Sequence, residues 1–210
     1  MSQKLWSIVL LCSATMGFAK ANTVITFDDL PGMANIPGSF VPAQNQLSNQ
    51  LLDSHKVVFN SGAGYVAVVN HVVPTPSLPN VIGGTNSSGQ LSYASNVQIR
   101  FMMTASVQGM VDYFKVRGDQ TPASGNAYLR AYDVSGNLLG SVTQPDSTAG
   151  LTLELSIPGI HRVELTQDSG TIGFDNVEYS TVLPVPEPTS MAAVVIGCAT
   201  WIRMRKGRRS

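Results

Sequence analysis

Three aspartates lie in short motifs near the two ends of the central part of the chain. Asp28 and Asp29 follow an apolar run at the start, and Asp175 stands near its end. In segment 171–179 the apolar alternation slips by one residue after Asp175, which predicts a β-bulge there. In a sheet whose first and last strands are neighbours the three carboxylates meet, and oxygen ligands suit Ca²⁺. In the alternative interpretation Asp28 and Asp175 end strands and accept turn hydrogen bonds.

A second group of residues has the side-chain types that bind sugars. Tyr128 and Tyr132 share one face of the expected strand 126–134, with Arg130 between them, and small apolar residues occupy the other face. If the apolar face packs into a core, the tyrosines form an outer stripe on which sugars stack. The opposite orientation, with both rings in the core, fits the alternation equally well. Both tryptophans lie in the terminal segments, so the stripe has only tyrosine rings.

Patterns typical of catalysis are missing from the sequence. It has no Gly-x-Ser-x-Gly, no His-Glu-x-x-His and no phosphate-binding P-loop. His55, His71 and His161 lie far apart without metal-ligand spacing, and both cysteines fall in the terminal segments. We therefore expect no enzyme activity. A glycan hydrolase with two facing carboxylates is the third alternative.

The elements that position these residues are expected to be short β-strands. Apolar residues alternate with polar ones in many runs after residue 22, whereas helical periodicity is hard to find. Asp133–Asn137 has hairpin-turn composition, with Gly136 and Asn137 at positive φ. Residues 30–56 and 70–95 are expected to be loops, the first with one or two helical turns within 44–52. The expected strands are 23–28, 57–59, 65–70, 96–102, 110–117, 126–134, 138–142, 151–157, 161–166 and 171–179.

About ten short strands in one domain are typical of an antiparallel β-sandwich, jelly-roll-like in its organisation. The domain is expected to span residues 22–183. All 13 acidic residues but only six basic ones lie between residues 22 and 188, which gives this part a net charge of about −7. No basic patch is present to neutralise phosphates, so nucleic acid binding is disfavoured.

The first 21 residues have the composition of a secretory signal peptide. Lys4 precedes the apolar run Leu5–Ala19, and Ala19 and Ala21 are small residues at the cleavage-site spacing. The apolar run is shorter than the roughly 20 residues that a bilayer-spanning helix needs. We expect export through the Sec translocon and cleavage after Ala21.

Residues 184–210 combine a proline motif, an apolar stretch and a basic end. The motif is Val185, Pro186, Glu187 and Pro188, and its prolines favour an extended chain. Residues 189–202 carry no charge and are expected to form a short transmembrane helix, with the basic end on the cytoplasmic side. The tail 203–210 contains Arg203, Arg205, Lys206, Arg208 and Arg209.

This order of motif, helix and basic end resembles the PEP-CTERM sorting signal of Gram-negative bacteria. The resemblance implies recognition and processing by an exosortase, an integral membrane protease-transpeptidase. The helix is then in the inner membrane before processing, and the protein afterwards reaches the cell surface or extracellular matrix. The family's association with exopolysaccharide implies a matrix or surface role.

The central part also resembles the globular domains that precede such tails. The motifs that carry the resemblance are Ile25–Leu30, Arg130–Asp133 with Gly136–Asn137, and Gly173–Val177. Similar motifs occur in jelly-roll carbohydrate-binding modules, some of which hold a structural Ca²⁺. We expect an exported, non-catalytic surface or matrix protein associated with exopolysaccharide. The alternative is a carbohydrate-binding module with a structural calcium site.

Overall fold

The computed structural model describes residues 22–71, 76–118, 125–145, 150–168 and 170–186. The predicted signal peptide with its cleavage site lies outside the described residues, as do Glu187, Pro188, the helix 189–202 and the basic tail. Among the residues that are described, no helix is both long enough and apolar enough to cross a membrane.

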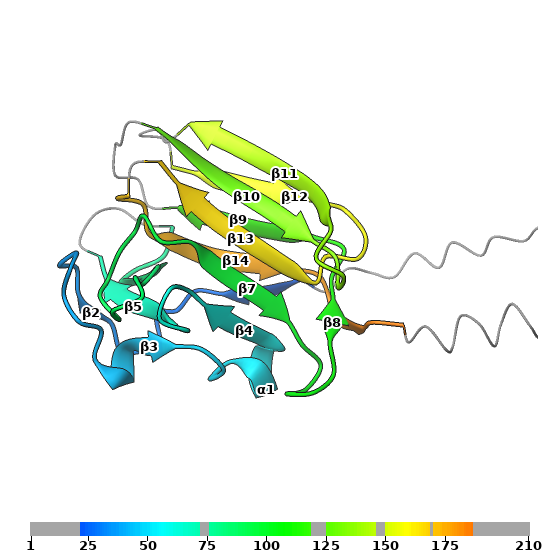
Figure 1. The fold of residues 1–210 in the computed structure, drawn as a ribbon, viewed down its shortest axis with the longest axis horizontal. Coiled ribbons are helices and arrows are strands. Elements are labelled where there is room, and N and C mark those ends of the chain that lie inside the picture. The colour runs from blue at the N-terminus through cyan, green and yellow to red at the C-terminus, as the bar shows by residue number, and fades with distance from the viewer. Residues whose placement is uncertain (1–21, 72–75, 119–124, 146–149, 169, 187–210) are drawn as a thin grey trace, which may run out of the picture.

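Two β-sheets pack face to face as a β-sandwich, as the alternation of apolar residues predicts. Figure 1 shows them as stacked layers, with β10, β13 and β7 in the layer nearer the viewer. The five-stranded sheet has the order β11–β10–β13–β7–β4, and all its pairs are antiparallel. Its strands are β4 (Val57–Asn60), β7 (Val97–Phe101), β10 (Asn126–Tyr132), β11 (Leu138–Pro145) and β13 (Arg162–Gln167).

The second sheet has eight strands and a mixed arrangement. Its main path is β12–β9–β14–β6–β5–β2, while β1 pairs with β14 and β3 with β5. Only the short β2 runs parallel to its neighbour β5 among the described pairs. Its strands are β1 (Thr23–Ile25), β2 (Met33–Ala34), β3 (Gln46–Leu47), β5 (Val66–Asn70), β6 (Asn80–Gly83), β9 (Phe114–Gly118), β12 (Thr152–Leu155) and β14 (Phe174–Tyr179). A separate pair joins β8 (Gly109–Met110) to β15 (Leu183–Pro184).

The core lies between the two sheets and is built by alternation. The residues of β10 that face it, Ala127, Leu129 and Ala131, have no exposed surface. Aromatic rings fill the centre, where the Phe101 ring lies 5.2 Å from the Tyr179 ring and 6.2 Å from the Phe114 ring. Burying one large apolar side chain contributes about 1.5 to 3 kcal/mol, so alternation over many strands holds this domain together.

The ten expected strand segments all contain strand, but the two expected loops contain more structure than predicted. The loop 70–95 includes β6, whose four residues are all buried. A strand buried on both faces shows no alternation, so the sequence pattern could not reveal it. In residues 30–56 the helical turns η1 (Ala43–Asn45) and α1 (Leu52–His55) flank β3 instead of filling 44–52. The expected strand 110–117 is split into β8 and β9.

The turn between β10 and β11 forms where the sequence predicts it. Gly136 has a φ of 84°, and its N–H donates to the Asp133 carbonyl. Asn137, expected at positive φ, is not among the described residues that adopt it. Its main-chain and side-chain N–H groups instead donate to the two Asp133 carboxylate oxygens, each at 2.8 Å. The asparagine thus stabilises the turn by hydrogen bonds rather than by an unusual backbone angle.

Candidate functional site

The two candidate tyrosines and the arginine between them face away from the core. Tyr128 and Tyr132 are half-buried on the outer face of the five-stranded sheet, and Arg130 is exposed. The alternative interpretation that placed both rings in the core is therefore wrong. A strand of a two-layer sandwich buries only one face, and on β10 that face carries the small apolar residues.

Strand register places a continuous set of polar side chains around these tyrosines. On β13, Arg162 pairs with Tyr132 and Glu164 pairs with Arg130. On β7, Arg100 pairs with Arg162 and Gln98 pairs with Glu164. Together with Asp168, which follows β13, these residues form what we call the tyrosine–arginine face. Its members are Gln98, Arg100, Tyr128, Arg130, Tyr132, Arg162, Glu164 and Asp168.

Hydrogen bonds hold both tyrosine rings in defined positions. The Tyr132 hydroxyl donates to Glu164 Oε2 and the Tyr128 hydroxyl to Asp168 Oδ2, each at 2.9 Å. In each case the acceptor lies two residues beyond the register partner on β13, so both rings lean in the same direction. Burial and the hydrogen bond to Glu164 raise the pKa of Tyr132. Its hydroxyl therefore remains a donor at neutral pH.

Arginine guanidinium groups contact both rings. The Arg162 guanidinium lies 4.0 Å from the centre of the Tyr132 ring, and Arg130 lies 5.7 Å from that of Tyr128. Arg162 also donates to Glu164 Oε1 at 2.5 Å, an oxygen that Gln98 Nε2 approaches at 3.0 Å. A ligand on this face would meet aromatic rings and planar cations together.

A shallow hollow continues this face toward the edge strand β4. It has a volume of about 120 Å³, and its lining includes Asn60, Gln98 and Arg100. The Arg100 side chain is exposed and forms neither a hydrogen bond nor an ion pair with any residue that the structure describes. The hollow thus offers an available cation next to amide groups that can donate and accept hydrogen bonds.

The two ends of the domain lie side by side, as the calcium interpretation requires. Strand β1 pairs with β14, with Ile25 opposite Val177. The register of β14 against β9 shifts between Asp175 and Glu178, and Asn176 has a φ of 46°. The predicted β-bulge at Asp175–Asn176 is confirmed. Asp175 and Asp28 accept hydrogen bonds from Ser77 and Asn80, which belong to the same short segment, so the two carboxylates lie in one region of the domain. Burial raises the pKa of Asp175, and the negative charge of Asp28 adds to the rise.

Asp175 is completely buried and accepts several hydrogen bonds. The Ser77 N–H and hydroxyl approach its Oδ2 at 2.8 and 2.9 Å, and the Asn176 N–H approaches Oδ1 at 2.6 Å. Burial raises the pKa of Asp175 to about 6, although the hydrogen bonds from Ser77 and Asn176 lower it. Asp28 Oδ1 accepts the Asn80 N–H at 3.2 Å. Both aspartates thus accept hydrogen bonds, as the alternative interpretation expects, but Asp175 lies within β14 and accepts from a segment 98 residues away rather than ending a strand at a turn.

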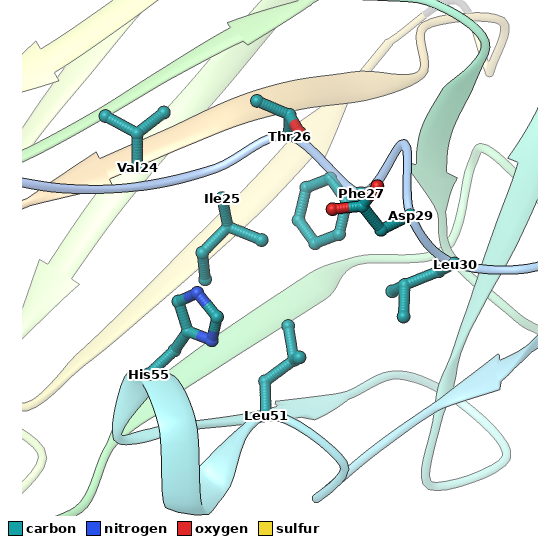
Figure 2. A pocket seen from close by; sticks show the side chains of 8 residues that line it. All are labelled: Val24, Ile25, Thr26, Phe27, Asp29, Leu30, Leu51 and His55. Atoms are coloured by element: carbon teal, nitrogen blue, oxygen red, sulfur yellow. The ribbon is translucent and has the colours of Figure 1, made fainter.

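Asp29 does not join this pair. It lines a separate pocket of about 150 Å³ with Phe27, Leu51 and His55, as Figure 2 shows. Phe27 has a φ of 64°, a left-handed conformation that reverses the chain just before the two aspartates. Within the described ranges, no three His, Cys, Asp or Glu side chains gather so that they could hold a metal ion. The structure therefore brings together only two of the three predicted calcium ligands, and calcium binding stays a prediction.

Of the predicted sorting motif, only Val185 and Pro186 lie in the described part of the chain. The Val185 N–H donates to the Gln108 carbonyl at 3.1 Å, directly after β15 pairs with β8. Val185 and Pro186 line a hollow of about 320 Å³ with Met110 and Val134 among its other residues. The strand β15 leads into the motif, and the hydrogen bond of Val185 attaches the start of the motif to the domain. The extended conformation predicted for the motif itself stays a prediction.

Sequence reasoning missed several residues of both candidate sites. Arg162 and Glu164 alternate with buried Val163 and Leu165 on β13, so their outward parity could have been found. Ser77 lies in an irregular segment 98 residues before Asp175 in sequence, and no local pattern connects the two.

Comparisons with known proteins give distant structural likenesses only. No protein-family model matches the chain, and no curated protein matches it. A mutant of the family 29 carbohydrate-binding module CBM29-2 is 12% identical with a TM-score of 0.35, over 76% of this chain and 92% of that one. A DUF4465 family protein from Bacteroides caccae is 10% identical with a TM-score of 0.34, over 82% and 97%. The enzymatically active domain of bacteriophage CBA120 tailspike protein 4 is 18% identical with a TM-score of 0.34, over 64% of this chain and 20% of that one. These likenesses are to carbohydrate-binding modules and other β-sandwich domains and assign no family.

Proposed function

We propose that this protein is an exported, non-catalytic surface or matrix protein that binds polysaccharide through its tyrosine–arginine face. The observation that carries the proposal is the pair of outward rings, Tyr128 and Tyr132, fixed on a regular sheet by their hydroxyl hydrogen bonds. Rings that are already held in place lose little conformational freedom when a ligand binds, which favours affinity.

The groups around the rings fit a polar ligand with many hydroxyls. Gln98, Arg130 and Glu164 offer donors and acceptors within one sheet face, next to the apolar surface of the rings. Sites of this composition suit sugars, which present both hydroxyls and apolar ring faces. The proposal combines the two roles: the protein acts at the surface or in the matrix, and it does so by binding carbohydrate.

Binding is tested with the full-length protein in a non-ionic detergent, by affinity electrophoresis through gels that contain single polysaccharides. We expect Tyr128→Ala and Tyr132→Ala each to weaken binding by about 1 to 3 kcal/mol, the scale measured for aromatic stacking on bases. Because both rings lie outside the core, the melting temperature should change little. Phe40→Ala is the matched control, since Phe40 is 70% exposed and lies on a loop outside this face. A large loss of stability with unchanged binding would contradict the proposal.

We further propose that the tail sorts the protein through an exosortase. The support is the order of the Val-Pro-Glu-Pro motif, apolar stretch and basic end. In a host with the exosortase, replacing Pro186 and Pro188 with alanine should leave an unprocessed protein in the membrane, whereas Pro184→Ala should be processed normally. Deleting residues 185–210 should release soluble protein. If mass spectrometry of the mature protein finds Arg208 and Arg209 still present, the tail is only an anchor.

A further inference from the structure

Positive charge is concentrated on the tyrosine–arginine face, although the exported part of the chain is acidic. Three of the six basic residues between 22 and 188 lie there, Arg100, Arg130 and Arg162. The same face has two acids, Glu164 and Asp168, so its net charge is positive. The rest of this segment has three bases against eleven acids. A domain with this charge pattern repels anions from most of its surface and admits them at one face.

Two of these arginines stand directly opposite each other. Arg162 on β13 pairs with Arg100 on β7, where side chains of neighbouring strands are about 5 Å apart at Cβ. Like charges in this position destabilise a sheet. Glu164 neutralises Arg162, but Arg100 has no acidic partner among the described residues. An anionic group bound between the two guanidinium groups would remove this repulsion.

The chemistry of the face identifies the kind of anion. A guanidinium group presents parallel N–H donors that match a carboxylate, and it also stacks on flat surfaces. Tyr132 lies beside Arg162, and the hollow lies beside Arg100. Because Arg162 pairs with Arg100, one ligand could place an acidic group at the arginines and a sugar ring at Tyr132. Arg130 extends the cationic surface along β10 toward Tyr128.

We infer that the ligand of this face is an acidic polysaccharide whose sugars carry carboxylate groups. One carboxylate lies between Arg100 and Arg162 beside the hollow, and the adjoining sugars contact Tyr132 and Tyr128. This inference rests on the proposed polysaccharide binding and adds the charge of the ligand to it.

The test uses pairs of polysaccharides that differ only in charge. Polygalacturonate, alginate and hyaluronate are each compared with their own methyl esters, with the full-length protein in a non-ionic detergent. We expect the acidic form to bind at least tenfold more tightly than its ester for one or more pairs. Binding to the acidic form should also weaken between 50 and 500 mM salt, because salt screens exposed charges.

Single-residue variants then test whether the preference for acidic polysaccharide depends on the tyrosine–arginine face. Arg100→Gln and Arg130→Gln should each weaken binding of the acidic polysaccharide about tenfold and weaken binding of its ester much less, because the ester has no charge for them to pair with. Arg117→Gln is the matched control, because Arg117 is exposed on β9 of the other sheet and the same charge is lost. All three positions are exposed, so the variants should fold, and their melting curves verify this.

The outcomes separate this inference from the proposal on which it rests. If esters bind as tightly as the acidic forms and Tyr132→Ala weakens both, polysaccharide binding holds and the acidic ligand is wrong. If no acidic or neutral polysaccharide binds, the proposed function itself fails. If inorganic polyphosphate binds as tightly as the acidic polysaccharides and Tyr132→Ala has no effect, the face is a general anion-binding surface and the inference is overturned.

Discussion

Asp168 on the tyrosine–arginine face and Asp175 at the β14 bulge accept similar hydrogen bonds, but their pKa values are shifted in opposite directions. Asp168 Oδ2 accepts the Asn126 N–H at 3.1 Å and the Tyr128 hydroxyl at 2.9 Å. Asp175 likewise accepts main-chain N–H groups, from Ser77 and Asn176, and the hydroxyl of Ser77. The hydrogen bond from Tyr128, with those from Asn126, lowers the pKa of Asp168, whereas burial raises the pKa of Asp175 to about 6.

The difference shows that burial, and not the number of hydrogen bonds, decides which form of a carboxyl group the fold prefers. Asp168 is exposed and Asp175 has no exposed surface. Hydrogen bonds favour the charged form at both positions, but desolvation outweighs them only inside the protein. The exposed carboxyl of Asp168 therefore stays charged at neutral pH, whereas the buried carboxyl of Asp175 mainly affects stability.

The largest effect on stability should come from removing the buried acceptor. Asp175→Ala leaves the Ser77 N–H and hydroxyl and the Asn176 N–H without their acceptor inside the protein. We expect a loss of about 2 to 4 kcal/mol in the free energy of unfolding at pH 5, measured by urea denaturation. Asp168→Ala is the matched control, and because Asp168 is exposed it should cost much less stability. Equal losses at the two positions would contradict the role of burial.

The pH dependence of stability should differ in sign between the two aspartates. The pKa of Asp175 is raised from an ordinary 3.8 to about 6 in the folded state, so its stabilising contribution is full below pH 3.8 and lost as the pH rises through 6. A shift of this size corresponds to a loss on the order of 3 kcal/mol relative to Asp175→Asn.

The opposite slope is expected for Asp168. Its lowered pKa gives a contribution that is present above pH 3.8 and lost as the pH falls further. Urea titrations of the protein, Asp175→Asn and Asp168→Asn from pH 3 to pH 7 measure both slopes. If the difference between the protein and Asp175→Asn does not change between pH 4 and pH 7, Asp175 is not desolvated as the structure implies.

Melting curves with and without Ca²⁺ decide whether Asp28 and Asp175 are calcium ligands or only hydrogen-bond acceptors. A ligand that binds only the folded state adds about 2.7 kcal/mol at a hundred times its dissociation constant. Bound Ca²⁺ would thus raise the melting temperature by several degrees over that in chelator, at about 2 to 4 °C per kcal/mol, and Asp175→Asn would remove the difference. Identical melting curves in chelator and in millimolar Ca²⁺ would leave Asp175 as a buried hydrogen-bond acceptor only.

The smallest effect is expected for a single hydroxyl on the exposed face. Tyr128→Phe keeps the ring and removes the hydrogen bond to Asp168. We expect less than about 1 kcal/mol of lost stability, because water can replace an exposed hydrogen bond. Thermal unfolding measures this change, and polysaccharide binding by the same variant shows whether fixing the ring matters for affinity. A loss as large as that of Asp175→Ala would show that the face contributes to stability as much as the buried site does.

The amino-acid sequence by itself determined the features that depend on neighbouring residues. The alternation in β10 separates Tyr128 and Tyr132 from the small apolar residues, and the slip in the last strand places the bulge at Asp175. The hairpin at Gly136 follows from turn chemistry. In each case the side-chain period or the allowed backbone angles act over a few residues, so a local pattern is sufficient.

Tertiary structure alone decided which of these features meet. Only the packing of two sheets put the tyrosines outside, and only register put Arg100, 62 residues earlier in sequence, opposite Arg162. The same holds for Ser77 and Asp175, and for Asp29, which lines a pocket with Leu51 and His55. Contacts between distant segments depend on the register and order of strands, which arise when many apolar side chains are buried together, so no single stretch of sequence contains them.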